Sequence, residues 1–247
     1  GIRGGSATVH FPIWHQEIED ILVLKNNKGT EDNRVRKLDY SIQISRLFYE
    51  RFISGDDISL FSPHDVPNLY DLFGTEEFDG LYRAYEEDDR IPKKRIPAQE
   101  LFGQLIKERA ETGRIYIMNI DHCNSHSSFL DKVEMSNLCQ EITLPTKPLQ
   151  HIDDPNGEIA LCILSAINIG KVRSDNELEE LCDLTVRALD ELIDYQKYPV
   201  IAAEQGTKNR RSLGVGYIGL AHYLAKLGFN YDSQEAWAVS YTHLTLP

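Results

Sequence analysis

The spacing of apolar positions along the chain predicts helices that alternate with strands. Apolar side chains three and four residues apart mark the helices, and short alternating or wholly apolar runs mark the strands. The predicted helices span 14–24, 39–52, 98–106, 177–195 and 216–227, and the predicted strands span 7–11, 114–120 and 158–169. This order is typical of an α/β fold with parallel strands.

The apolar run at 158–169 is predicted to be a strand buried on both faces, as in the interior of an α/β protein. We find no internal repeat and no low-complexity linker along the chain. A single α/β unit is therefore favoured over two domains.

Composition narrows the class of protein. The chain has 247 residues, of which 41% are hydrophobic, and a formal net charge of -13. So acidic a surface repels a phosphate backbone, which argues against general binding to nucleic acid. Because no run approaches the roughly 18 apolar residues that cross a bilayer and no secretory signal opens the sequence, we expect no membrane segment and a cytoplasmic location.

The four cysteines are too sparse for a disulfide scaffold, and none forms a C-x-x-C pair. The most suggestive is Cys139, because Asn137 and Glu141 each lie two residues from it. If this stretch is extended, the thiol, the amide and the carboxylate share one face. Such a face offers a reactive sulfur, a group that positions a hydroxyl and a group that moves a proton. The alternative is a small buried hydrophobe, which local sequence alone favours for both Cys139 and Cys162.

A second cluster of chemically active side chains is His122, Cys123 and His126. These residues could be metal ligands, but one thiol and two imidazoles are also ordinary in a loop, which we favour. We therefore expect no metal site in the chain.

Ten short segments occur in the same order as in one known family: RGG at 3–5, LVLKNN at 22–27, NRVR at 33–36, LFSPHDVP at 60–67, TGRIYI at 112–117, DHCN at 121–124, SNLC at 136–139, LPTKP at 144–148, NGEIALC at 156–162 and RRSLGVG at 210–216. On these segments the chain resembles the large, catalytic subunit of class I ribonucleotide reductases, from residue 1 to about 228. The pattern is most similar to the aerobic bacterial enzymes that partner a di-iron radical-generating subunit.

The resemblance implies a ten-stranded α/β barrel with an internal finger loop, of which residues 1–236 would be a partial catalytic domain. It implies that Cys139 becomes a thiyl radical and abstracts the 3′-hydrogen of a ribonucleoside diphosphate. Glu141 would accept the 3′-hydroxyl proton, and Asn137 would hydrogen-bond the ribose hydroxyls. Cys162 would be a redox-active cysteine whose disulfide partner is not in this chain.

The opening loop, with Arg3, Gly4 and Gly5, resembles the mobile segment that carries information from the allosteric effector to the substrate base. The resemblance also implies dNTP and ATP effectors, a homodimer of large subunits, and thioredoxin or glutaredoxin as reductant. The radical would come from a metal-containing small subunit, and no cofactor would be bound by this chain itself.

Both ends of the family pattern are absent, so the resemblance implies an internal fragment that is inactive alone. An incomplete barrel exposes strand edges and apolar surface, so we expect the isolated chain to fold poorly or aggregate, and a sharp cooperative melt would contradict this. Residues 237–247 resemble nothing at that place in the family and are interpreted as an appended, artefactual tail.

Two other functions remain open on the sequence. One is a truncated, non-catalytic module that binds a nucleotide or another subunit. The other is an anaerobic or cobalamin-dependent relative with the same barrel and finger loop, against which the closeness of the segments to the two-subunit aerobic pattern argues.

Overall fold

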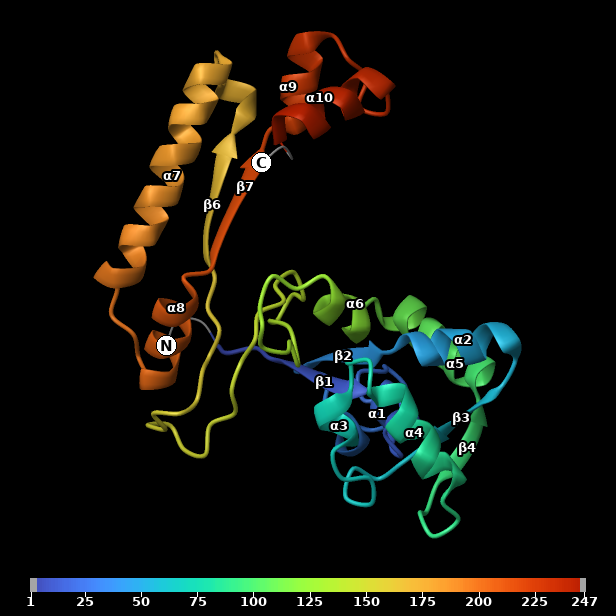
Figure 1. Cartoon of the computed structure of the whole chain (residues 1–247). Coiled ribbons are helices and arrows are strands. Elements are labelled where there is room, and N and C mark those ends of the chain that lie inside the picture. Colours follow the sequence, from blue (N-terminus) through green and yellow to red (C-terminus); the bar gives the residue numbers. More distant parts are fainter. Residues whose placement is uncertain (1–3, 245–247) are drawn as a thin grey trace. The chain divides into compact units, whose positions relative to one another are not determined.

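The computed structural model describes residues 4–244 and divides into two compact units, 1–146 and 147–247 (Figure 1). Both units mix helices with strands, which confirms the predicted α/β class. Within the described residues the strands form three separate open sheets and no closed barrel. One catalytic domain over 1–236 stays a prediction.

The first unit holds five strands and six α-helices among its described residues. In chain order they are β1 (Thr8–Pro12), α1 (Ile18–Leu22), β2 (Asp39–Ile44), α2 (Arg46–Ser54), β3 (Asp57–Leu60), α3 (Leu69–Leu72), α4 (Phe78–Glu87), β4 (Lys94–Pro97), α5 (Ala98–Thr112), β5 (Ile115–Asn119) and α6 (Ile120–Ser125), with a 3-10 turn at Glu31–Asn33.

The central sheet of this unit is parallel and has the order β1–β2–β5. Its middle strand corrects the helix predicted at 39–52, because residues 39–44 form β2 and the helix begins only at Arg46. The sequence DYSIQI alternates polar and apolar residues, and this period of two places Tyr40, Ile42 and Ile44 together in the hydrophobic core.

The core lies under this sheet and is rich in aromatic side chains. Trp14 and Phe73 meet edge to face at 5.9 Å between ring centroids. The helix predicted at 14–24 is shorter than expected, because α1 begins at Ile18 and Trp14 is instead buried in the preceding turn. Helix α5 begins at Ala98 as predicted but continues beyond residue 106 to Thr112, and it is followed by Gly113, whose φ of 66° suits a left-handed C-cap.

The antiparallel pair β3–β4 is fastened to α4 by Tyr82. The buried hydroxyl of Tyr82 donates to the carbonyl of Ser59 (2.6 Å) and accepts from the Ser59 amide (2.8 Å). Burial raises the pKa of Tyr82 well above its usual value, so the neutral phenol is the form that holds this contact.

Replacing Tyr82 by phenylalanine is expected to lower the free energy of unfolding by about 1–3 kcal/mol, because two backbone groups of Ser59 lose a buried partner. Urea denaturation of the full-length protein measures the change. The matched control is Tyr85→Phe, which removes an exposed bond to the Pro67 carbonyl. Equal losses in the two variants would contradict the role given to Tyr82.

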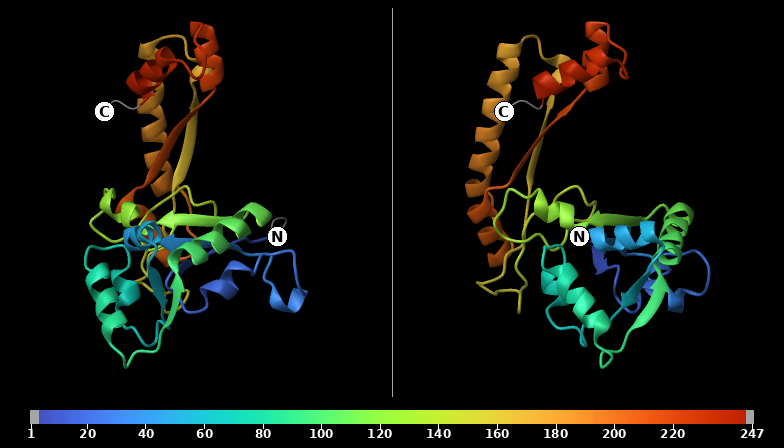
Figure 2. Two further views of the ribbon diagram at one scale, coloured as in Figure 1. Left: turned by 90° about the vertical axis from the view of Figure 1, so that its right-hand side faces the viewer. Right: turned by 45° about the vertical axis from the view of Figure 1, so that its right-hand side comes forward.

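The second unit contains β6 (Ile163–Asn168), α7 (Asp175–Tyr195), α8 (Ile201–Arg210), β7 (Leu213–Ile218), α9 (Leu220–Leu227) and α10 (Gln234–Leu244), with a 3-10 turn at Ile169–Lys171. Strands β6 and β7 are parallel, and α7 packs along the pair (Figures 1 and 2). Helix α7 begins at a serine cap, where the Ser174 hydroxyl accepts from the Glu177 amide (3.2 Å).

Two predictions in this unit are corrected. The helix predicted at 216–227 begins at Leu220, because β7 continues to Ile218 and Gly219 turns the chain with a φ of 80°. The strand predicted at 158–169 to be buried on both faces is β6, in which Leu164 is 60% exposed while Ile167 is buried. Helix α7 covers only one side of the strand pair, so alternate residues remain open to solvent.

No helix within residues 4–244 is long and apolar enough to cross a membrane. Helix α10 begins at Gln234, three residues before the tail predicted at 237–247. Residues 245–247 of that tail lie outside the described residues.

Candidate active site

A loop carrying Cys139 lies against one face of the sheet β1–β2–β5. We call residues 133–142 the cysteine loop. Figure 1 shows this segment in yellow-green beside β1 and β2. This segment contains no helix or strand. Its conformation is therefore determined by the contacts of its side chains and carbonyls with the sheet.

The face of the sheet beneath the cysteine loop is polar. Thr8 and His10 lie two positions apart in β1 and therefore on the same face of the strand, and the same holds for Ser41 and Gln43 in β2. In the parallel register His10 is opposite Ser41, so these side chains share one face, whereas Ile42 and its apolar neighbours share the other.

Three of these side chains bind main-chain carbonyls of the cysteine loop. The Thr8 hydroxyl donates to the carbonyl of Leu138 (2.6 Å), Nε2 of His10 donates to that of Ser136 (3.1 Å), and the Gln43 amide donates to that of Glu134. Backbone carbonyls that a strand or helix would have satisfied thus find partners on the sheet.

Within the loop, Ser136 and Asn137 close a compact turn. The Ser136 hydroxyl donates to the carbonyl of Ile142, and the Ile142 amide donates to Oδ1 of Asn137 (3.1 Å). The amide of Gln140 donates to the carbonyl of Asn137 (3.1 Å), and Gln140 has a left-handed φ of 59°.

This turn corrects the geometry expected for Asn137, Cys139 and Glu141. An extended strand would place the three side chains on one face, but residues 137–140 form a turn and the period of two does not apply. All three residues are exposed, and one side-chain oxygen of Asn137 holds the loop closed. Their catalytic roles stay predictions.

His10 is a titratable residue of β1 whose side chain contacts the backbone of the cysteine loop. Burial lowers the pKa of His10, while its bond to the Ser136 carbonyl opposes that shift. A neutral imidazole with its proton on Nε2 fits this contact. Its buried Nδ1 has no hydrogen-bond partner among the described residues.

Sequence patterns had not indicated that Thr8, His10, Ser41 and Gln43 are parts of the site. The alternation of polar and apolar residues in β2 is the signal that could have found two of them, had this segment been assigned as a strand. The bonds themselves join residues 91 to 130 positions apart, which no local pattern indicates.

Cys162 lies in the second unit, directly before β6, and is half-buried. Its Sγ is close to the backbone of Gly214 in β7, because a Cβ added at Gly214 would lie 3.1 Å from that sulfur. The same Cβ would lie still closer to Cδ2 of Leu164, so a glycine at this position makes room for both the leucine side chain and the thiol.

Arg210 fixes the segment that precedes Cys162. Two N–H groups of Arg210 donate to Oε2 of Glu158 (3.0 and 2.7 Å), and Lys147 donates to Oε1 (2.7 Å). These bonds, that of Lys147 foremost, hold the pKa of Glu158 below its usual value. The chain before Cys162 is thereby fixed to the end of α8.

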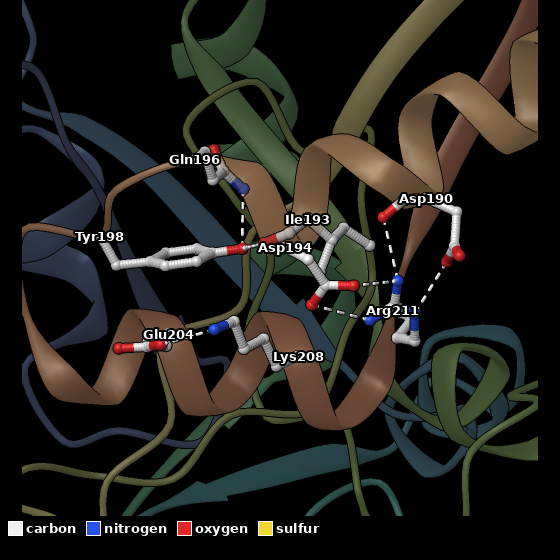
Figure 3. Close-up of polar contacts among 8 residues, drawn as sticks. All are labelled: Asp190, Ile193, Asp194, Gln196, Tyr198, Glu204, Lys208 and Arg211. Atoms are coloured by element: carbon white, nitrogen blue, oxygen red, sulfur yellow. Dashed lines mark hydrogen bonds and ion pairs between the residues drawn. The ribbon is translucent and has the colours of Figure 1, made fainter.

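Arg211 fixes the start of β7 to helix α7 (Figure 3). Its guanidinium donates to the carboxylates of Asp190 (2.7 Å) and Asp194 (3.0 and 3.3 Å) and to the Asp190 carbonyl (2.9 Å). Figure 3 also shows the Tyr198 hydroxyl, which donates to the Ile193 carbonyl (2.7 Å) at the end of α7.

Gly4, Gly5, Cys123 and Cys182 are not among the residues 133–142 that form the cysteine loop. Gly4 and Gly5 are exposed and have open space where a Cβ would lie, whereas Arg3 lies outside the described residues. Burial raises the pKa of Cys123, and Cys182 is an exposed residue of α7. Among residues 4–244 no group of three or more histidine, cysteine or acidic side chains is placed to hold a metal ion.

Comparison with known proteins gives one consistent answer. The family described as "Ribonucleotide reductase, barrel domain" matches residues 1–245, a stretch that includes most of the predicted tail.

The chain is 57% identical over 241 residues to the ribonucleoside-diphosphate reductase subunit alpha of Haemophilus influenzae, covering 96% of this chain and 32% of that protein. It is 56% identical, with the same coverage, to the ribonucleoside-diphosphate reductase 1 subunit alpha of Escherichia coli. Against the large subunit of Danio rerio the identity is 36%, over 95% of this chain and 29% of that protein. The chain thus spans about a third of the length of the relatives it matches.

Proposed function

Because the chain belongs to the ribonucleotide reductase barrel-domain family, we propose that the full-length protein reduces ribonucleoside diphosphates to deoxyribonucleoside diphosphates. In this proposal the sheet β1–β2–β5 is part of a ten-stranded barrel, and the cysteine loop is its finger loop. The observation that carries the proposal is the docking of this loop on the polar face of the sheet, with Cys139 exposed at its turn.

Three residues of the cysteine loop have separate roles in the first chemical step. A thiyl radical on Cys139 abstracts the 3′-hydrogen of the ribose, which leaves a thiol on Cys139 and a radical at C3′, and after the reduction the thiol returns this hydrogen to C3′ and becomes the thiyl radical again. Glu141 accepts the proton of the 3′-hydroxyl, and Asn137 hydrogen-bonds the ribose hydroxyls. The exposure of these three side chains leaves them accessible to a substrate.

The reduction itself needs two electrons. The bond from C2′ to its hydroxyl breaks, the oxygen leaves as water, and a hydrogen takes its place. Cys162 and a second thiol outside this chain supply the two electrons and two protons and end as a disulfide. Thioredoxin or glutaredoxin then reduces that disulfide.

The proposal also assigns partners. A metal-containing small subunit supplies the radical, and two large subunits form a homodimer. ATP and dNTP effectors act through the opening loop with Arg3, Gly4 and Gly5, whose glycines permit movement. This chain would bind no cofactor of its own.

An activity assay tests the proposal directly. The full-length protein is mixed with its small subunit, thioredoxin, thioredoxin reductase, NADPH and CDP, and dCDP is measured by chromatography. We expect dCDP in the complete mixture and none when the small subunit is omitted. Absence of dCDP with a small subunit whose radical is verified spectroscopically would overturn the proposed function.

A further inference from the structure

Gln140, the residue after Cys139, has a backbone conformation that its neighbours must maintain. Its φ of 59° lies in the left-handed region, which a residue other than glycine adopts rarely and only where its surroundings hold it. The main-chain bond from its amide to Asn137 closes the turn on one side only. A second restraint is therefore needed.

The side chain of Gln140 supplies that restraint by bridging two strands. Its Nε2 donates to the carbonyl of Ile117 in β5 (2.7 Å), and its Oε1 accepts from the hydroxyl of Ser41 in β2. Ser41 is fully buried, so its hydroxyl has no water to replace this partner. The donor and the acceptor of the side-chain amide are thus both used. A flipped amide would place its oxygen against the Ile117 carbonyl oxygen, which cannot donate a hydrogen bond.

Cys139 is consequently held from both sides. The residue before it is fixed by the bond from Thr8 to the Leu138 carbonyl, and the residue after it by the bridge of Gln140. The thiol itself is exposed. Its position depends on these flanking anchors.

We propose that Gln140 is a positioning residue that sets the place of the Cys139 sulfur by fastening the turn to β2 and β5. This inference rests on the proposed function, in which Cys139 transfers a hydrogen atom. Such a transfer requires close approach of the reacting atoms, so a displacement of about 1 Å costs on the order of 100-fold in rate.

The test is Gln140→Leu in the full-length enzyme with its small subunit. We expect kcat per folded enzyme to fall by about 10- to 100-fold. We expect KM for CDP to stay within about twofold, because the substrate-binding groups remain. The matched control is Gln99→Leu on α5, which removes the same kind of bond from a glutamine amide to a carbonyl, that of Phe52 in α2 (3.0 Å). It should leave kcat unchanged.

Ser41→Ala provides a second variant should Gln140→Leu fold poorly. It removes one end of the bridge, so we expect a smaller fall in kcat. In the double variant, losses that do not add would support a shared role, since both residues act through one contact. Additive losses would count against the bridge.

Two outcomes separate this inference from the proposed function. Wild-type kcat in Gln140→Leu, with Cys139→Ser inactive, overturns the positioning role alone. Turnover in Cys139→Ser overturns the function on which the role rests. A fall in total activity that follows the fraction of unfolded protein in every variant, Gln99→Leu included, with kcat per folded enzyme unchanged, also overturns the positioning role, because it shows a loss of stability only.

Discussion

Cys139→Ser in the full-length protein is expected to abolish formation of deoxyribonucleoside diphosphate. Serine keeps the shape of the side chain and the turn at residues 137–140, whose bonds are made by neighbouring groups. The O–H bond of an alcohol is much stronger than the S–H bond of a thiol, so the radical cannot be placed on this side chain. The expected loss is therefore complete, and the assay of dCDP measures it.

The chain offers a matched control for this substitution. Cys182 is also exposed but lies on α7, and no role in the reaction is assigned to it. Cys182→Ser should keep the wild-type rate, which would show that loss of an exposed thiol is harmless by itself. Full activity of Cys139→Ser, with its folding confirmed by circular dichroism, would contradict the assignment of the radical thiol.

The sequence predicts the elements of the fold better than their exact kinds and limits. The helix at 177–195 and the strand at 114–120 carry strong local patterns, and both appear as α7 and β5. The helix predicted at 39–52 includes residues 39–44, which form strand β2 instead. Pairing with two neighbouring strands decides their structure, and these partners lie far away in the sequence.

The candidate site could likewise be predicted only in part from the sequence. The spacing of Asn137, Cys139 and Glu141 drew attention to the cysteine loop, but the turn that carries Cys139 was missed. A left-handed Gln140 has no local signal, because the bridge to β2 and β5 that accompanies it is a tertiary contact. The polar face of the sheet was missed for a different reason, because the prediction of a helix at 39–52 hides the alternation of polar and apolar residues in β2.

Cys162→Ser is expected to have a different effect from Cys139→Ser, although both should stop product formation. A hydroxyl is smaller than a thiol, so serine fits the space beside Gly214 without displacing β7. Arg210, Glu158 and Arg211 continue to hold the adjacent segments. The structural effect should therefore be small, and any loss reports on the chemistry of the sulfur.

That chemistry is the supply of two electrons, to which Cys139 does not contribute. In Cys162→Ser the radical should still reach Cys139 and remove the 3′-hydrogen, but no dithiol is present to reduce C2′ and form the new disulfide. We expect loss of the small-subunit radical signal on addition of CDP, followed by electron paramagnetic resonance, with dCDP at background. In Cys139→Ser the same signal should persist. Normal dCDP formation by Cys162→Ser would contradict its redox role, and a signal unchanged by CDP would contradict the separation of the two cysteines into radical and reducing functions.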